Sequence, residues 1–301
     1  MARLILSDES IFNNSLQGFP TPNVDHASEK VKDRSEIEVL IETKGDKDYI
    51  EPKKIGLNII YDDKEIIIVD KPSGLTVHPG AGNKSNTLVN GLMHIYKNSL
   101  SNLSGSFRPG IVHRIDKETS GVIVIARNNF SHAKLSEQFS DHTVKRKYIA
   151  LVWGVIRPLK GKISTLISRS KKNRQLMTVS EVNGKKAITN YKTIKVFSVK
   201  NIPKISLIEC KLETGRTHQI RVHMKYKGVS LLGDKQYGKK NLKFKKIDEN
   251  FLKILNNIDG QTLHAKSLSF NHPTSKKLVN FESNLPKDFQ KMLDLLEKLS
   301  G

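Results

Sequence analysis

The sequence predicts an α+β fold, and two observations support this class. Apolar runs of strand length come in pairs joined by short polar turns, and helix-like patterns lie between these pairs without the repeating strand–helix–strand order of parallel α/β proteins. No internal repeat of fixed period is present. With 301 residues, the chain is long enough to bury a sizeable core, and we expect one main domain with a small appendage.

The first 50 residues are polar and irregular, apart from a strand-like run at residues 31–41. Residues 42–54 are rich in charge and predict a linker around Gly45. The first clear hairpin follows this linker. Its strands are expected at residues 56–61 and 65–71, over a turn at 62–63.

Alternating helix and strand patterns continue to the C-terminus. Asn86 is a candidate N-cap for a helix with apolar residues at 88, 89, 92 and 93. A short helix is expected at 133–139, a strand at 148–153, further β structure at 196–212, and a helix at 216–227 that ends at Gly228. The apolar residues at 289, 292, 293, 296 and 299 follow helical spacing, so we expect a final helix that packs against the core.

The composition points to a polyanionic partner. Lys and Arg number 51 against 30 Asp and Glu, which gives a formal net charge of +21. Such an excess suits nucleic acid or a membrane surface, although part of it reflects a Lys-rich composition. The first ten residues hold only a short apolar run and no stretch approaches a membrane span, so we expect a cytoplasmic protein without a membrane partner.

The chain has a single cysteine, Cys210. An intramolecular disulfide and a metal site built on several thiolates are therefore excluded. The residues around Cys210 alternate like a strand, and we expect a small buried side chain rather than a nucleophile.

The most informative stretch runs from His113 to Gly121, with the sequence HRIDKETSG. It lies between the apolar runs 110–112 and 122–125, so it predicts two strands joined by a turn that holds Asp116 on a rigid edge. From the local pattern alone, the alternative is an ordinary hairpin turn with a solvated carboxylate.

This stretch resembles the signature H-R-[LI]-D-x-x-T-S/T-G of the RluA/RluD family of pseudouridine synthases. Other blocks match the family in order, and the resemblance runs from about Glu51 to the C-terminus, closest to the RluD-like branch. These blocks are Lys71-Pro72-Ser73-Gly74, Val77-His78-Pro79-Gly80, Arg146-Lys147-Tyr148, residues 212–223 with the sequence LETGRTHQIRVH, Leu232-Gly233-Asp234, Tyr237-Gly238, Leu263-His264-Ala265 and His272-Pro273.

The resemblance implies a pseudouridine synthase fold, in which a mixed, mostly antiparallel sheet with flanking helices surrounds a central cleft. It also implies isomerisation of uridine, which needs no redox cofactor, small-molecule cofactor or metal. By resemblance, Asp116 is the catalytic carboxylate and Arg221 is its charge partner, which would keep the carboxylate ionised. Tyr148 would stack on uracil or transfer a proton. The alternatives are a phosphate-contacting Arg221 and a core Tyr148.

Three further residues are candidates for RNA binding. Arg114 could fill the stack that an extruded base vacates, and Arg216 suits a phosphate contact. His113 is the weakest of the three and could instead hydrogen-bond the turn. His78, His218, His223, His264 and His272 form no recognisable ligand set, and structural roles are expected for them.

By resemblance, residues 1–50 are a truncated or degenerate S4-like RNA-binding segment plus linker, because its two leading helices are not recognisable. A tail with a short strand is the alternative. Residues 51–301 would form the catalytic domain.

The function expected from these features is an RNA pseudouridine synthase acting on large-subunit (23S) rRNA, free or in a pre-ribosomal particle. The alternatives are a non-catalytic basic RNA-binding or ribosome-assembly factor and a related synthase acting on tRNA. A glycosidase would need a second carboxylate at a set separation. A P-loop enzyme is disfavoured because Gly215-Arg216-Thr217 lacks the glycine-rich lead of that motif.

Overall fold

A computed structural model describes residues 3–4, 37–38, 50–80, 83–97, 99–238, 248–258 and 260–300. The chain forms two compact units, Met1–Asp48 and Tyr49–Gly301. In the first unit, β1 (Arg3–Leu4) pairs antiparallel with β2 (Ile37–Glu38), which lies inside the run predicted as a strand. The rest of the proposed S4-like segment lies outside the described residues, and its RNA-binding role stays a prediction.

The second unit contains a sheet of ten strands among its described residues, in the order β3-β4-β5-β11-β6-β10-β9-β7-β8, with β12 paired to β11. These strands are β3 (Asn58–Asp62), β4 (Ile66–Lys71), β5 (Ser120–Ala126), β6 (Lys145–Trp153), β7 (Lys160–Arg169), β8 (Met177–Ser180), β9 (Lys185–Phe197), β10 (Ile205–Leu212), β11 (Leu263–Asn271) and β12 (Leu278–Glu282). Among these strands, only β5 and β11 pair in parallel. The predicted α+β class with a mostly antiparallel sheet is confirmed.

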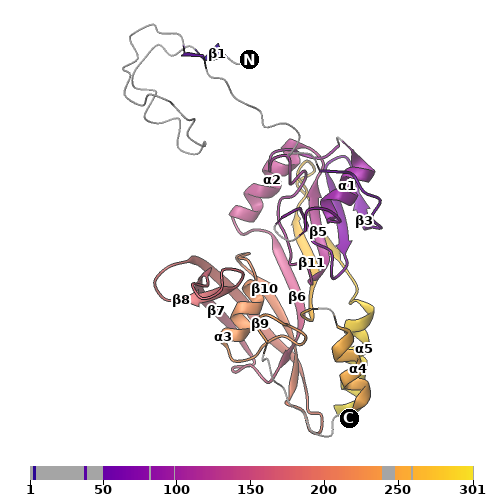
Figure 1. Cartoon of the computed structure of the whole chain (residues 1–301), viewed down its shortest axis with the longest axis vertical. Coiled ribbons are helices and arrows are strands. Elements are labelled where there is room, and N and C mark those ends of the chain that lie inside the picture. The colour runs from indigo at the N-terminus through magenta and orange to yellow at the C-terminus, as the bar shows by residue number, and fades with distance from the viewer. Residues whose placement is uncertain are drawn as a thin grey trace. The chain divides into compact units, whose positions relative to one another are not determined.

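Five helices flank this sheet in the described part of the second unit (Figure 1). They are α1 (Leu88–Tyr96), α2 (Asn129–Ser140), α3 (Gln219–Tyr226), α4 (Glu249–Asn257) and α5 (Lys287–Ser300). Helix α2 contacts β5, α3 contacts β8 and β9, and α4 packs against α5. No helix of the described residues is both long and apolar enough to cross a bilayer.

The central strand β5 is buried on both faces. All seven of its residues are buried, and Ile123 and Ile125 join one apolar cluster whereas Val122 and Val124 join another. A strand covered on both faces reads as a continuous apolar run, which is how it appears in the sequence. The apolar stripe of α5 joins a buried cluster with residues of β6, β9, β10 and α4, so it packs in the core as predicted.

The predicted hairpin around Asp116 is half wrong. Residues 122–125 lie in β5, but residues 110–112 make only a single bridge, between Ile111 and Ile125. Gly110 has φ +72° and bends the chain away from an extended course, so residues 112–119 form a loop. Strand β5 also has a neighbouring strand on each side, so the loop that carries Asp116 enters a central strand of the sheet rather than an edge strand.

Two helix starts also differ from the prediction. Thr87, not Asn86, is the N-cap of α1, because Asn86 has φ +62° and the Asn90 side chain accepts from both the backbone N–H and the hydroxyl of Thr87. Helix α3 begins at Gln219 rather than at Arg216, because His218 adopts a left-handed conformation as its N-cap. The helix predicted at 133–139 and the strand at 148–153 are confirmed, as is buried Cys210.

Gly121 permits the parallel pairing of β5 with β11. Its φ is +109°, and a Cβ added there would lie 2.2 Å from the carbonyl oxygen of Ala265. We expect Gly121→Ala to lower the free energy of unfolding by about 2–4 kcal/mol, through backbone strain and this clash. Urea titration would measure the loss. Gly56→Ala is the matched control, because nothing lies within 4 Å of its added Cβ. Equal stabilities for the two variants would contradict the role given to Gly121.

Candidate active site

A cavity of about 430 Å³ opens where the loop before β5, strand β6 and helix α3 meet. All six residues singled out in the sequence line this cavity: His113, Arg114, Asp116, Tyr148, Arg216 and Arg221. The fold therefore brings together three segments that are far apart in the sequence. Asp116 comes from the loop, Tyr148 from β6 and Arg221 from α3.

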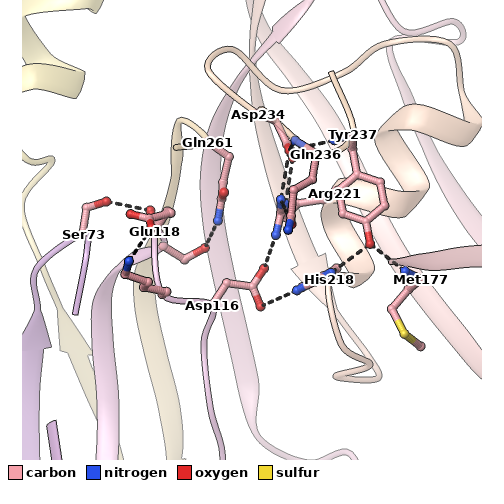
Figure 2. A network of polar contacts seen from close by, with 12 residues as sticks. Ser73, Asp116, Glu118, Met177, His218, Arg221, Asp234, Gln236, Tyr237 and Gln261 are labelled. Carbon is pink, nitrogen blue, oxygen red and sulfur yellow. Dashed lines mark hydrogen bonds and ion pairs between the residues drawn. The ribbon is translucent and has the colours of Figure 1, made fainter. Parts of the chain in front are cut away.

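Arg221 lies between two carboxylates (Figure 2). Its Nη1 donates to Asp116 Oδ2 at 3.3 Å, while its Nε and Nη2 donate to the two oxygens of Asp234 at 2.7 and 2.9 Å. The side chain of Arg221 is only 6% exposed and that of Asp234 is fully buried. Burial opposes the charge on both groups, but their mutual contact outweighs it, so the pKa of Arg221 is raised and the pKa of Asp234 is lowered.

Asp234 also organises the chain that follows it. Its Oδ1 accepts the backbone N–H groups of Gln236 and Tyr237, and the Gln236 side chain accepts from Arg221 Nη2 at 2.8 Å. A buried carboxylate with this many donors is well satisfied. The sequence match included the block Leu232-Gly233-Asp234 without giving Asp234 a role, and the structure shows that it holds the guanidinium that reaches Asp116.

His218 lies on the other side of Asp116. Its Nε2 is 4.0 Å from Asp116 Oδ1, and its Nδ1 is 2.8 Å from the hydroxyl of Tyr237. The Tyr237 oxygen accepts the backbone N–H of Met177, so its own hydrogen is free to bond Nδ1. In that arrangement, a neutral His218 presents an Nε2–H toward the carboxylate. Burial lowers the pKa of His218 although Asp116 acts to raise it, which favours the neutral ring. We expected a structural role for this histidine, and the structure shows that it lines the cavity beside Asp116.

The loop that carries Asp116 is fixed at several points. The buried Lys71 ammonium donates to the carbonyl oxygens of Pro72, Leu75 and Lys117 at 2.7, 2.8 and 2.9 Å. The backbone N–H of Thr119 donates to the Asp116 carbonyl, which closes a tight turn. These contacts hold the turn that positions Asp116.

Tyr148 lies on the cavity wall at 7% exposure. Burial raises the pKa of its phenol. The charge of Arg146 acts to lower this pKa, and the charge of Asp116 acts to raise it. The hydroxyl therefore keeps its proton at neutral pH. Apolar side chains complete this wall of the cavity, namely Ile115, Leu212, Ile220 and Leu263.

The three candidate RNA-binding residues differ in their surroundings. Arg114 is exposed and contacts His78 Nε2 at 3.1 Å, and Arg216 donates through Nε to the Lys186 carbonyl. His113 Nε2 accepts the backbone N–H of Val124 at 3.1 Å. Burial, with a smaller effect of a nearby arginine, lowers the pKa of His113 to about 3, so this ring carries no charge at neutral pH. An RNA contact of His113 stays a prediction.

Comparison with known proteins identifies the family. A family model described as RNA pseudouridylate synthase matches residues 65–226, which is more than half of the chain. The chain belongs to this family of RNA pseudouridine synthases. The ribosomal large subunit pseudouridine synthase D of Zymomonas mobilis is 47% identical to this synthase, over 82% of this chain and 74% of its own length.

Other relatives of this synthase support the same family assignment. An RNA pseudouridine synthase of Bacillus subtilis is 45% identical, over 81% of this chain and 74% of its own. The solved structure of human RNA pseudouridylate synthase domain containing 4 superposes with a TM-score of 0.60 at 26% identity, covering 80% of this chain and 93% of that one. The resemblance to the RluA/RluD family is confirmed, and the synthase is an isomerase that converts uridine to pseudouridine in RNA.

Breaking the buried pair of Arg221 and Asp234 should destabilise the fold, because it leaves a buried charge with less compensation. Asp234→Asn keeps the side-chain size but leaves the buried Arg221 with a single carboxylate, so we expect a loss of about 3 kcal/mol in the free energy of unfolding. Chemical denaturation would measure it. Asp288→Asn is the control, because the side chain of Asp288 is 63% exposed and pairs only with Lys291 on the surface of α5. A loss no greater than that of the control would show that the pair contributes little.

Acid should weaken the fold through His223. This side chain is fully buried between Thr165 and Thr189, and burial lowers its pKa from 6.5 to about 4. Between these two values the unfolded chain binds a proton that the folded chain does not. We therefore expect unfolding to become easier by about 1.4 kcal/mol per pH unit from this residue as the pH falls from about 6.5 to about 4. Urea titrations across this range would measure the slope.

The matched variant for this test is His223→Gln, which cannot take up the proton. Its unfolding free energy should change less steeply with pH than that of the wild type, by about the same 1.4 kcal/mol per unit. Parallel slopes for the two proteins would show that His223 is not responsible.

Proposed function

We propose that this synthase isomerises specific uridines of large-subunit ribosomal RNA, free or within a pre-ribosomal particle in the cytoplasm. The substrate is supported by the names of its relatives, which are ribosomal large subunit pseudouridine synthases at 47% identity in Zymomonas mobilis and 42% in Neisseria meningitidis. The net charge of +21 suits such a polyanion.

The observation that carries the chemical assignment is the position of Asp116. Among the described residues that line the cavity, Asp116 is the only acid, and it is bonded to the buried Arg221. A single carboxylate favours the isomerase over a glycosidase, which uses two. We therefore assign the catalytic carboxylate to Asp116 and its charge partner to Arg221.

The reaction breaks the N1–C1′ bond of a uridine, turns the uracil and forms a C5–C1′ bond, after which C5 loses its proton and N1 gains one. Attack of Asp116 on C1′, attack on uracil C6 and removal of the C2′ proton are three routes to this outcome. Each needs an ionised carboxylate, beside the ribose for the first and third routes and beside the uracil for the second. Arg221 supplies a positive charge next to this carboxylate.

Tyr148 and the apolar wall are suited to the loose uracil. The buried ring of Tyr148 offers a stacking surface. Its hydroxyl is protonated, so it would take the proton from C5 only by passing its own proton on in the same step. Arg114, which is exposed in the loop that carries Asp116, would enter the stack that an extruded base leaves. Base extrusion costs a few kcal/mol, which these contacts would offset.

Asp116→Asn tests the carboxylate. We expect pseudouridine formation to fall by roughly 10²–10⁴-fold, because the variant keeps the size of the side chain but not its charge, while RNA affinity stays within a few fold. Glu118→Gln is a matched acid in the same loop, and since its carboxylate does not line the cavity it should keep most of the activity. Site-resolved mapping of pseudouridine in RNA incubated with each enzyme gives the rates.

The same mapping, on RNA from cells with and without the gene, tests the substrate. Loss of pseudouridine from large-subunit rRNA is expected. Loss confined to tRNA would redirect the proposal to that substrate, and no loss anywhere would favour a non-catalytic RNA-binding factor.

A further inference from the structure

Arg146 is a buried cation that has no carboxylate partner among the described residues. It lies on β6 at 9% exposure and lines the cavity. Its Nη2 donates to the carbonyl oxygen of Glu213 at 3.1 Å and its guanidinium lies over the ring of Phe139, 5.5 Å from the centroid. Its Nε is buried with no hydrogen-bond partner among the described residues.

The charges around Arg146 make this position costly. Burial is the main cause that lowers the pKa of Arg146, and the neighbouring Arg216 acts in the same direction. A buried charge is normally paired, because an unpaired ion loses its hydration without compensation. Arg221, which lines the same cavity, is compensated in this usual way because it contacts two carboxylates. The described residues offer Arg146 no such anion.

The surrounding chain leaves room for the guanidinium. A Cβ added to Gly215 would lie 2.5 Å from Arg146 Nη1, so glycine at this position lets the guanidinium reach the cavity. Arg216 is the residue after Gly215. Its Nε donates to the Lys186 carbonyl, so its terminal nitrogens can bind other partners. The guanidinium groups of both Arg146 and Arg216 thus belong to residues that line the same cavity.

The position of Arg146 relative to Tyr148 indicates what the missing anion is. The two residues are two apart on β6, so their side chains leave the same face of the sheet about 6.7 Å from one another. A uracil stacked at Tyr148 would bring its own sugar–phosphate backbone to this distance. A guanidinium offers a planar fork of donors that matches a phosphate.

We infer that Arg146, with Arg216 beside it, forms a binding subsite for an RNA phosphodiester next to the target uridine. This inference rests on the proposed function, because it places the uracil at Tyr148. Among the described residues the guanidinium has no anionic partner, and the backbone of the substrate would supply one.

The first test is the salt dependence of binding. The dissociation constant for an in vitro transcript of large-subunit rRNA is measured between about 50 and 200 mM salt for the wild type, Arg146→Met and Arg146→Lys. We expect Arg146→Met to bind about tenfold more weakly or worse and its log–log salt slope to be shallower by about 0.7–0.9, the value for one phosphate. Arg146→Lys, which keeps the charge but not the fork, should keep the slope.

Lys298→Met is the matched control for loss of one positive charge, because Lys298 lies exposed on α5. It should leave both the affinity and the slope near those of the wild type. An Arg146→Met variant with the same slope as Lys298→Met would overturn the inference.

The second test is the thermal stability of the RNA-free proteins. Removal of an unpaired buried charge should leave the melting temperature of Arg146→Met equal to that of the wild type or higher. A marked drop in melting temperature together with an unchanged salt slope would show that Arg146 only holds Glu213 and Phe139 in place.

A third arm separates this inference from the proposed function. Sodium phosphate should raise the melting temperature of the wild type above that in sodium chloride of equal ionic strength, and should do so less for Arg146→Met. This result needs no uridine conversion, so the subsite stands even if rRNA is not the substrate. The subsite would be refuted if phosphate stabilised the wild type no more than Arg146→Met and if the salt slope of RNA binding were the same for both proteins.

Discussion

The ion pair of Arg221 with Asp234 is the contact on which the cavity depends. Asp234 is fully buried and takes two of the guanidinium nitrogens, so Arg221 is oriented before any substrate arrives, and its remaining terminal nitrogen faces Asp116. A buried guanidinium held in this way supplies a fixed positive charge next to Asp116, so the proposed reaction would need no reorganisation of this charge. The same aspartate caps the turn to Tyr237, which in turn contacts His218.

The sheet explains how these groups meet. Strand β11 pairs in parallel with β5 and antiparallel with β6, so it joins the strand that follows the Asp116 loop to the strand that carries Tyr148. Gly121 and Ala265 approach closely where this parallel pairing occurs. The position of the carboxylate relative to the tyrosine is thus set by backbone hydrogen bonding in the middle of the sheet, where displacement is costly.

Much of the site could be predicted because its residues occur in compact motifs. Asp116, Tyr148 and Arg221 each stand in a short block, and the order of these blocks indicated the family. The roles of Asp234 and His218 could not be predicted in this way, because they arise from how α3 packs on the loop that follows it. Strands β7 and β8 and most of β9 were missed, because lysines and polar residues interrupt their alternation. The predicted strand at 110–112 failed because the bend at Gly110 is a property of tertiary packing against Ile125.

Lys71 also holds the loop of Asp116, and its hydrogen bonds limit which residues position 71 can accept. An ammonium group has three hydrogens that radiate from one point, and here each of them meets a different backbone carbonyl. Arginine carries more donors but spreads them in a plane, and glutamine offers only two. No other natural side chain can therefore reproduce this arrangement of three donors. A change from lysine to arginine would keep the charge but alter the geometry of the loop that carries Asp116.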